Sequence, residues 1–261
     1  MSAHLQRMLA ALDRGEGCAP ITDAEPGFDL AAAYRLAHSL TAERLARGER
    51  PVGRKTGFTN TTIWPRYNVA GPIWGMVWDR TLQAGAGRLA LGHLCEPRIE
   101  PEIVLRLRAV PESGADPVAL AACVEAMAMG FEIVQSPFPG WRFRAPDTVA
   151  AFGLHGALVT GPWITADAER LARLSDFAVV LQRDGARVDQ GHARNVLGDG
   201  PLRALDYLAR AVAADPGALP LAPGEVVSTG TLTDAWPVAP GQVWHAETTL
   251  PFLPPLTLAL D

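Results

Sequence analysis

The chain has 261 residues, of which 48 % are hydrophobic and 20 % charged, and its net charge at pH 7 is -5. This composition is typical of a globular protein, and the negative charge without a basic, aromatic-rich cluster argues against nucleic acid as a partner. No apolar run has transmembrane length and the N-terminus lacks a signal-peptide pattern, so we expect a cytoplasmic enzyme with no membrane contact.

The first fifty residues are predicted to be helical. An amphipathic helix is expected over residues 5–12 and a second helix over 29–48, where apolar residues recur at helical spacing and arginines occupy the other face. Gly48 stands where a helix C-cap belongs. Residues 51–80 contain Gly, Pro and aromatic residues at short spacing, which indicates loops and short strands, including one over 74–79.

The middle of the chain contains the clearest strand, residues 98–108, in which Pro101 predicts either an edge strand or the start of a strand. Asp116 followed by Pro117 predicts a helix start. We expect this helix to be buried nearly all round, to run to about Met129 and to end at Gly130. A strand is then expected over 131–134.

Several short elements are predicted in the last third of the chain. They are strands over 154–160 and 177–183, a hairpin turn over 183–186, a helix from Gly200-Pro201 to about Ala213, and strands over 226–232, 242–247 and 256–260. Many short strands with helices toward both ends of the sequence predict an α+β fold and argue against regular βαβ winding.

Lys55 is the only lysine of the chain, since the other 22 of the 23 Lys+Arg residues are arginine. It lies in the segment Gly53-Arg54-Lys55-Thr56-Gly57-Phe58-Thr59. A lysine amine can lose its proton when it is buried, whereas a guanidinium stays charged. Lys55 therefore either carries out proton transfer or is present by chance in a chain whose composition strongly favours arginine.

Glu100 and Glu102 are two residues apart in the predicted strand, so their carboxylates face the same side. Two close carboxylates in apolar surroundings repel each other, and a divalent cation would relieve this. All-oxygen ligands favour Mg²⁺, Mn²⁺ or Ca²⁺ over Zn²⁺. Glu132, in the apolar strand 131–134, would be a costly unpaired charge and is the candidate third ligand. The alternatives are a solvated edge strand and an ion pair between Glu132 and an arginine.

Other residues leave two interpretations open. Asp79 either caps a turn or faces a substrate, and His155 is either a hydrogen-bonded core residue or an acid or base. His192, Arg194 and Asn195 lie in a polar loop that could reach a ligand. The sequence contains no Gly-x-Ser-x-Gly elbow, P-loop or dinucleotide fingerprint. Its three scattered cysteines predict neither a disulfide framework nor a zinc site.

The order and spacing of these segments resemble the fumarylacetoacetate hydrolase superfamily, in its 2-keto-4-pentenoate hydratase/4-oxalocrotonate decarboxylase branch. The similarity covers nearly the whole chain. It rests on Leu30-Ala31-Ala32-Ala33-Tyr34, the Lys55 segment, Gly75-Met76-Val77-Trp78-Asp79, Pro97-Arg98-Ile99-Glu100-Pro101-Glu102-Ile103, Phe131-Glu132-Ile133-Val134, Gly198-Asp199-Gly200-Pro201-Leu202 and residues 224–233.

The resemblance implies a single domain over residues 1–261, with a helical N-terminal part (1–50) and a β-rich catalytic core (51–261) built on a mixed, rolled sheet. It also implies a homo-oligomer, and Mg²⁺ or Mn²⁺ held by Glu100, Glu102 and Glu132. The substrate would be a 2-oxo acid or its dienol, which chelates the metal. The residues expected to act on or contact it are Lys55, Asp79, His155, Phe58, Thr59, Trp78, Gln135 and Thr231.

Two segments depart from the branch. An aspartate and a basic residue usually follow the third metal ligand shortly, where this chain has Gln135-Ser136-Pro137. An Asp-Asn-x-Ser-like segment is replaced by residues 151–156, which include His155. The substrate could therefore differ from the usual dienol, and residues 137–146 could form an aromatic, basic wall against it.

The leading hypothesis is a metal-dependent lyase that adds water to a 2-hydroxy-2,4-dienoate, with Lys55 and Asp79 moving protons. The pKa of Lys55 is expected to be lowered by burial beside a cation. The first alternative is decarboxylation of a 2-oxo diacid or hydrolysis of an acylpyruvate. The second is a non-catalytic scaffold subunit.

Overall fold

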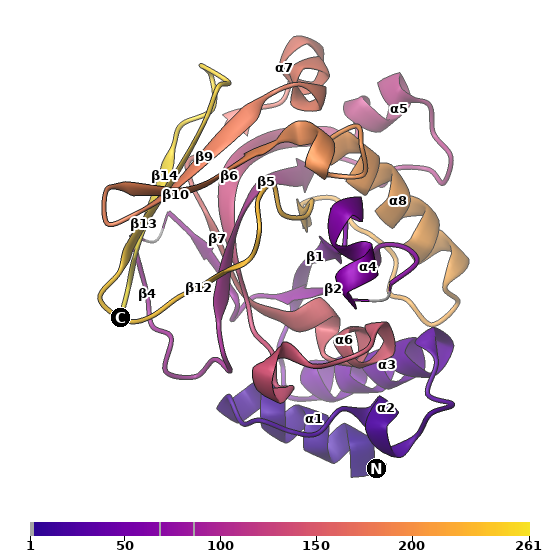
Figure 1. The fold of residues 1–261 in the computed structure, drawn as a ribbon. Coiled ribbons are helices and arrows are strands. Elements are labelled where there is room, and N and C mark those ends of the chain that lie inside the picture. The colour runs from indigo at the N-terminus through magenta and orange to yellow at the C-terminus, as the bar shows by residue number, and fades with distance from the viewer. Residues whose placement is uncertain (1–2, 68, 86) are drawn as a thin grey trace.

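The computed structural model describes residues 3–67, 69–85 and 87–261, and a strongly curled mixed β-sheet occupies its centre (Figure 1). The strands are β1 (Pro51–Gly57), β2 (Ile73–Trp78), β3 (Leu82–Ala84), β4 (Arg88–Leu89), β5 (Arg98–Leu107), β6 (Val124–Val134), β7 (His155–Thr160), β8 (Ile164–Thr165), β9 (Ala178–Arg183), β10 (Ala186–His192), β11 (Val226–Ser228), β12 (Trp236–Pro237), β13 (Val243–Thr248) and β14 (Leu256–Leu260).

Helices surround the sheet. The α-helices are α1 (Ala3–Arg14), α2 (Ile21–Ala24), α3 (Leu30–Ala46), α4 (Trp64–Tyr67), α5 (Pro117–Ala122), α6 (Ala145–Ala150), α7 (Ala168–Ala172) and α8 (Pro201–Ala214). Single 3₁₀ turns occupy Thr61–Ile63, Pro139–Trp141, Phe152–Leu154, Arg173–Ser175 and Ala193–Asn195. These bounds confirm the predicted α+β class.

Two sheets form from these strands. The larger runs in the order β2-β1-β11-β5-β6-β7-β3, with β12 added beside β5 and β8 beside β6. Its pairs are antiparallel except β1 with β11 and β3 with β7. The smaller sheet runs β10-β9-β13-β14-β4. The long pair β5–β6 is therefore central, and it carries the residues of the site described below.

The N-terminal helices fold as their sequence pattern predicts. Asp29 caps α3 by accepting a hydrogen bond from the Ala32 N–H, and Gly48 beyond its end has φ +83°. α3 packs against α1 and α6 below the sheet in Figure 1. Its buried side chains include Leu36 and Leu40, so the apolar stripe of the sequence faces the core.

Two predictions around the central strands are wrong. The helix that begins at Pro117 ends at Ala122, and residues 124–134 form β6, which pairs along its length with β5. Cross-strand burial overrides the helix propensity of this Ala- and Met-rich segment. Gly130 lies within β6, where a Cβ atom would stand 2.4 Å from the Val104 side chain.

Pro101 does not mark an edge or a strand start. It is the fourth residue of the central strand β5, at a point where β11 has ended and β12 has not yet begun. There its carbonyl accepts a hydrogen bond from the Leu232 N–H. A proline fits because this stretch of β5 has no regular partner strand on that side.

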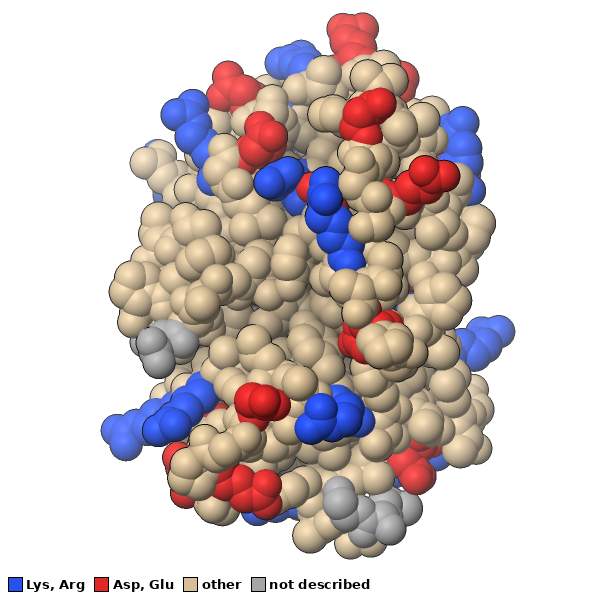
Figure 2. Space-filling model, turned by 90° about the vertical axis from the view of Figure 1, so that its right-hand side faces the viewer, with Lys and Arg blue, Asp and Glu red and all other residues tan. Residues whose placement is uncertain are grey.

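The remaining predicted elements agree to within a few residues, except that the strand expected over 226–232 ends at Ser228. Among the described residues, no helix is long and apolar enough to cross a membrane. On the face shown in Figure 2, charged side chains gather toward the top and bottom, and few lie across the middle.

Candidate active site

Three glutamates meet on one face of the β5–β6 pair. The register places Glu100 directly opposite Glu132, and Glu102 lies two residues along β5 on the same face. One carboxylate oxygen from each residue lies within 4.8 Å of the other two. The predicted cluster of Glu100, Glu102 and Glu132 is thus assembled by strand alternation together with one cross-strand pair.

The buried oxygens of this cluster are incompletely hydrogen-bonded. Glu102 Oε2 accepts hydrogen bonds from Ser228 Oγ and from the Gly230 N–H at 2.8 Å. Among the described residues, Glu102 Oε1 is buried with no hydrogen-bond partner, and Glu132 Oε2 has only the Lys55 ammonium group beside it. Unsatisfied buried carboxylate oxygens are costly, so the cluster fits a cation with oxygen ligands.

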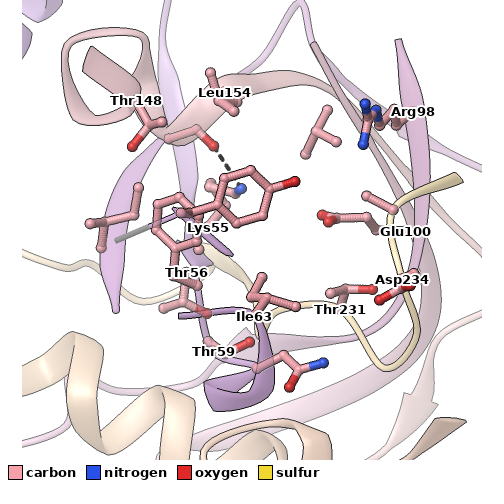
Figure 3. Close-up of a pocket in the computed structure, with 18 of the residues that line it drawn as sticks. Lys55, Thr56, Thr59, Ile63, Arg98, Glu100, Thr148, Leu154, Thr231 and Asp234 are labelled. Atoms are coloured by element: carbon pink, nitrogen blue, oxygen red, sulfur yellow. Dashed lines mark hydrogen bonds between the residues drawn. The ribbon is translucent and has the colours of Figure 1, made fainter. Parts of the chain in front are cut away.

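Lys55 lies beside this cluster. It belongs to β1 and is 2 % exposed. Its Nζ atom donates to the Gly153 carbonyl at 2.9 Å (Figure 3). The same atom lies 3.1 Å from Glu132 Oε2. Gly153 has φ +67°, and a Cβ there would stand 2.9 Å from Lys55 Cδ, so only glycine presents its carbonyl at this distance.

Burial and the charges of neighbouring groups shift the pKa values of the three glutamates in different directions. Burial raises the pKa of Glu100 to about 7 and that of Glu102 well above its ordinary range, and their carboxylate neighbours add to this effect. Burial alone would also raise the pKa of Glu132. The charge of Lys55 and the hydrogen bond from His155 outweigh it and leave that pKa below its ordinary value.

The surrounding protein groups raise the pKa of Lys55, and the lowering expected beside a bound cation stays a prediction. Burial does disfavour the ammonium form, but the charges of Glu132, Glu100 and Glu102 together outweigh it, and the pKa is raised. Lys55 is therefore the positive partner of the carboxylates, which keeps one cation in the cluster.

A cavity of about 100 Å³ opens between Lys55 and Glu100. Figure 3 shows these two residues on opposite sides of it, with Arg98, Asp234 and Thr231 on the side of Glu100. Of the predicted substrate contacts, Phe58, Thr59 and Thr231 line the cavity. Thr59 Oγ1 is buried there with no hydrogen-bond partner among the described residues. Charged, hydroxyl and aromatic groups thus converge on one small space.

The fumarylacetoacetate (FAA) hydrolase C-terminal family matches residues 88–253, more than half of the chain and including all three glutamates. This chain belongs to the fumarylacetoacetate hydrolase family. It is 30 % identical to 4-oxalocrotonate decarboxylase from a Pseudomonas species, over 90 % of this chain and 89 % of that protein. It is 31 % identical to 2-keto-4-pentenoate hydratase from Paraburkholderia xenovorans, over 93 % and 88 %.

Solved structures of the fumarylacetoacetate hydrolase family share this fold. The 4-oxalocrotonate decarboxylase from Pseudomonas putida G7, complexed with magnesium and adipate, superposes with a TM-score of 0.91 at 25 % identity, covering 99 % of this chain and 96 % of that one. Fumarylpyruvate hydrolase from Pseudomonas aeruginosa, with Mn²⁺ and pyruvate, has a TM-score of 0.63 at 16 % identity, over 81 % and 89 %. The predicted rolled, mixed sheet of the family is confirmed.

Two predicted substrate contacts of this family member lie away from the cavity. Trp78 is 1 % exposed and packs against Phe152 in the core. Gln135 is buried and accepts a hydrogen bond from the Cys95 N–H at 3.1 Å. Trp78 stands at the end of β2 opposite Pro51, four residues along β1 from Lys55. Both side chains belong to the packing around the site and do not reach its interior.

Asp79 is also absent from the cavity. It follows the last residue of β2, and its carboxylate accepts hydrogen bonds from the Arg50 N–H and from Arg50 Nε at 3.1 and 3.2 Å. These bonds lower its pKa below the ordinary value. This contact agrees with the turn-capping alternative. The proton-transfer role proposed from the resemblance has no geometric support, because Asp79 does not line the cavity.

We therefore expect Asp79→Asn to leave turnover within about twofold of the parent chain, because an exposed ion pair contributes little. Steady-state rates of the two proteins measured side by side test this placement. A thousandfold loss in the Asn variant would mean that Asp79 does reach the reacting atoms.

His155 lies behind Glu132 and outside the lining of the cavity. Its Nδ1 atom is 2.9 Å from Glu132 Oε1, and its Nε2 atom is 2.8 Å from Thr81 Oγ1. Because an ionised carboxylate only accepts hydrogen bonds, Nδ1 carries the proton toward Glu132. His155 is thus a positioning residue that fixes the orientation of one carboxylate, an arrangement common behind metal ligands.

The polar loop residues lie elsewhere. His192 and Arg194 contact Asp176, and Asn195 donates to the Leu232 carbonyl. Sequence reasoning gave no role to Ser228 or Gly230, although both donate to Glu102. The available signal was their place in residues 224–233, one of the segments that carry the family resemblance. In the structure Gly230 has φ +97°.

Proposed function

We propose that the chain is a metal-dependent hydro-lyase that adds water to a 2-hydroxy-2,4-dienoate and forms a 4-hydroxy-2-oxo acid. The observation that carries this proposal is the juxtaposition of three glutamates, two of them buried and Glu100 half-buried, with the single lysine at one cavity. Relatives named 2-hydroxyhexa-2,4-dienoate hydratase and 2-keto-4-pentenoate hydratase, each about 30 % identical over most of the chain, support it.

Glu100, Glu102 and Glu132 would hold Mg²⁺ or Mn²⁺. The partnerless oxygens of the cluster support this assignment, as do the magnesium- and Mn²⁺-bound structures of relatives. Such an ion would polarise the 2-oxo group of a bound substrate and stabilise the charge of its enolate form. Ser228 and Gly230 hold Glu102 in place, and His155 does the same for Glu132.

Lys55 is the group we assign to proton transfer. A divalent ion held by the three glutamates would offset the charges that raise the pKa of Lys55. The amine could then take the proton of the substrate 2-hydroxyl and return a proton to C5, which converts the dienol into a 2-oxo-3-ene. C4 of that form is electrophilic and accepts water, and C3 then takes a proton. The Gly153 carbonyl and Glu132 orient the Lys55 amine toward the cavity. Asp79, remote from the cavity, takes no part.

Decarboxylation of a 2-oxo diacid is the alternative that a specific observation favours. The 4-oxalocrotonate decarboxylase from Pseudomonas putida G7 superposes over 99 % of this chain. Both reactions pass through an enolate, so the carboxylates do not distinguish them. Product mass does: hydration adds one water and keeps every carbon, and decarboxylation releases CO2. Two carbon fragments would indicate hydrolysis. We expect the hydrated product, and CO2 from the best substrate would overturn the assignment as a hydratase.

Metal affinity is expected to depend on pH. The pKa of Glu100 is raised to about 7, so below that pH this ligand holds a proton that a divalent ion must displace. The association constant for Mg²⁺ should fall about tenfold for each pH unit below about 7, and more steeply where Glu102 also binds a proton. Calorimetric titration at several pH values measures this, and a constant affinity between pH 5 and 7 would contradict it.

A further inference from the structure

The cavity beside Lys55 continues outward into a second, larger space. The inner cavity measures about 100 Å³ and the outer groove about 530 Å³. Four residues line both of them: Tyr67, Arg98, Trp141 and Phe143. The inner space suits the head of a small 2-oxo acid. A longer substrate would have to leave it past these four side chains.

Aromatic rings dominate this exit. Phe58 and Tyr67 have ring centroids 5.7 Å apart, and Tyr67 stacks on Phe143 at 5.4 Å with their planes 9° apart. Phe143 in turn lies 6.1 Å from Trp141. We call these four rings the aromatic passage. All four line the inner cavity, so a ligand there meets a continuous series of ring faces and edges.

The aromatic passage is held in place by its backbone. Phe58 has φ +53°, and its carbonyl accepts a hydrogen bond from Trp64 Nε1 at 2.8 Å. Trp141 has φ +59°, and its Nε1 atom donates to the Glu96 carbonyl at 3.0 Å. Left-handed backbone at bulky residues is unfavourable and persists where surrounding contacts fix it, commonly at functional sites. The rings are therefore preorganised for a ligand.

Charge at the site favours a ligand with one carboxylate. Four acids lie in or behind the cavity wall: Glu100, Glu102, Glu132 and Asp234. Lys55, Arg98 and a divalent ion would balance them, which leaves no surplus positive charge in the inner cavity. The Arg98 guanidinium lies 4.0 Å above the Trp141 ring, and Arg98 lines the inner cavity together with Glu100 and Asp234. A second carboxylate would thus meet an Arg98 charge already offset by Glu100 and Asp234. Arg142 also lines the outer groove, but it is exposed, so solvent screens its charge.

We propose that the substrate is a 2-oxo acid, or its enol, with a flat and uncharged apolar tail that extends through the aromatic passage into the outer groove. An aromatic or conjugated tail fits the aromatic passage best. Such a tail can stack on the rings, whereas a saturated chain only makes van der Waals contact with them. This inference rests on the proposed function, which places the 2-oxo acid head between Lys55 and the three glutamates.

Binding of stable 2-oxo acids to the Mg²⁺-loaded full chain, measured by calorimetry, tests the proposal. Pyruvate probes the head alone. 2-Oxohexanoate and 2-oxoadipate have six carbons each and differ only in the terminal group, and 2-oxo-4-phenylbutanoate carries a flat ring. We expect 2-oxo-4-phenylbutanoate to bind about two- to tenfold more tightly than 2-oxohexanoate. 2-Oxoadipate should bind no better than 2-oxohexanoate.

Variants in the aromatic passage show which residues cause the preference for the phenyl ligand. Phe143→Leu and Tyr67→Leu keep an apolar side chain but remove a ring, so each should weaken binding of the phenyl ligand more than binding of pyruvate and thereby reduce the preference for the phenyl ligand. Phe252→Leu is the matched control, because Phe252 lies beneath Arg170 and Arg173 outside the cavity lining. The control should keep the full preference. Retained binding of pyruvate also shows that each variant is folded.

The outcomes separate this inference from the proposed function. Tightest binding of 2-oxoadipate would mean that Arg98 or Arg142 recognises a second carboxylate, and it would overturn the apolar-tail proposal alone. Equal affinity for all tails, or a preference that survives both ring variants, would also overturn it. Failure of every ligand to bind, pyruvate included, would overturn the proposed function and this inference together.

Discussion

Replacing Lys55 by arginine is expected to lower turnover by about a thousandfold, within the range of 10²- to 10⁴-fold that general acid–base groups contribute. The guanidinium keeps the positive charge beside Glu132 but does not release its proton at neutral pH. Because the positive charge stays, Mg²⁺ binding should change little. Steady-state kinetics and calorimetry on the same preparation measure the two effects separately.

The matched control for this variant is Asp79→Asn, which changes another residue singled out by the sequence but located outside the cavity. Lys55 has 2 % of its surface exposed, so the larger arginine could disturb packing. The Mg²⁺ titration reports on this, since a misfolded site would lose the ion as well. Near-normal turnover in the Lys55→Arg chain would remove Lys55 from the chemistry.

Glu102→Gln is expected to weaken Mg²⁺ or Mn²⁺ binding by about a hundredfold or more, because an amide replaces one of three charged ligands. Folding should be preserved. The pKa of Glu102 is raised far above its ordinary range, so the protonated acid, which glutamine resembles in shape, is already favoured in the fold. An amide oxygen can still accept from Ser228 and Gly230.

Glu125→Gln supplies the control for Glu102→Gln. Glu125 lies on β6, which pairs with β5, but its side chain is 46 % exposed and pairs with Arg106 at the surface. Its neutralisation should leave metal affinity unchanged. Equal affinity of the Glu102→Gln and parent chains would place the ion elsewhere. Absence of metal binding in the parent chain would favour the non-catalytic scaffold.

The glutamate cluster was accessible from sequence because it depends on short-range rules. Strand alternation alone places Glu100 and Glu102 on one face, and Glu132 is conspicuous as a charge in an apolar strand. The prediction survived even though most of β6 was assigned to a helix, because the residues around Glu132 were correctly expected to be extended. Only the cross-strand register, which places Glu100 opposite Glu132, could not be predicted, because sequence periodicity carries no information about it.

Asp79 shows where such reasoning fails. Its role came from resemblance, and the distance between Asp79 and Lys55 depends on the pairing of β1 with β2. Lys55 pairs with Gly75 and Pro51 with Trp78, which carries Asp79 and Trp78 to the end of the pair that is away from the cavity. A shift of a few residues in register would have brought a carboxylate to the lysine, and no local signal reports that register.

The aromatic passage could be predicted only in part. Residues 137–146 were expected to form a wall against the substrate, and Trp141 and Phe143 do line the cavity. Phe58 was expected to contact the substrate, but Tyr67 was not singled out. The stacking of Tyr67 on Phe143 joins segments separated by more than seventy residues. Contacts of this kind arise from the folded topology and have no counterpart in sequence spacing.

Exchange of the C3 protons of a 2-oxo acid tests the central claim most directly, because every reaction considered for this site passes through an enolate. Pyruvate incubated with the chain in D2O would be followed by proton NMR. We expect exchange that requires Mg²⁺ or Mn²⁺ and is lost in both Lys55→Arg and Glu102→Gln but kept in Asp79→Asn. Exchange that proceeds without metal, or undiminished without Lys55, would contradict an enolate site built from these residues.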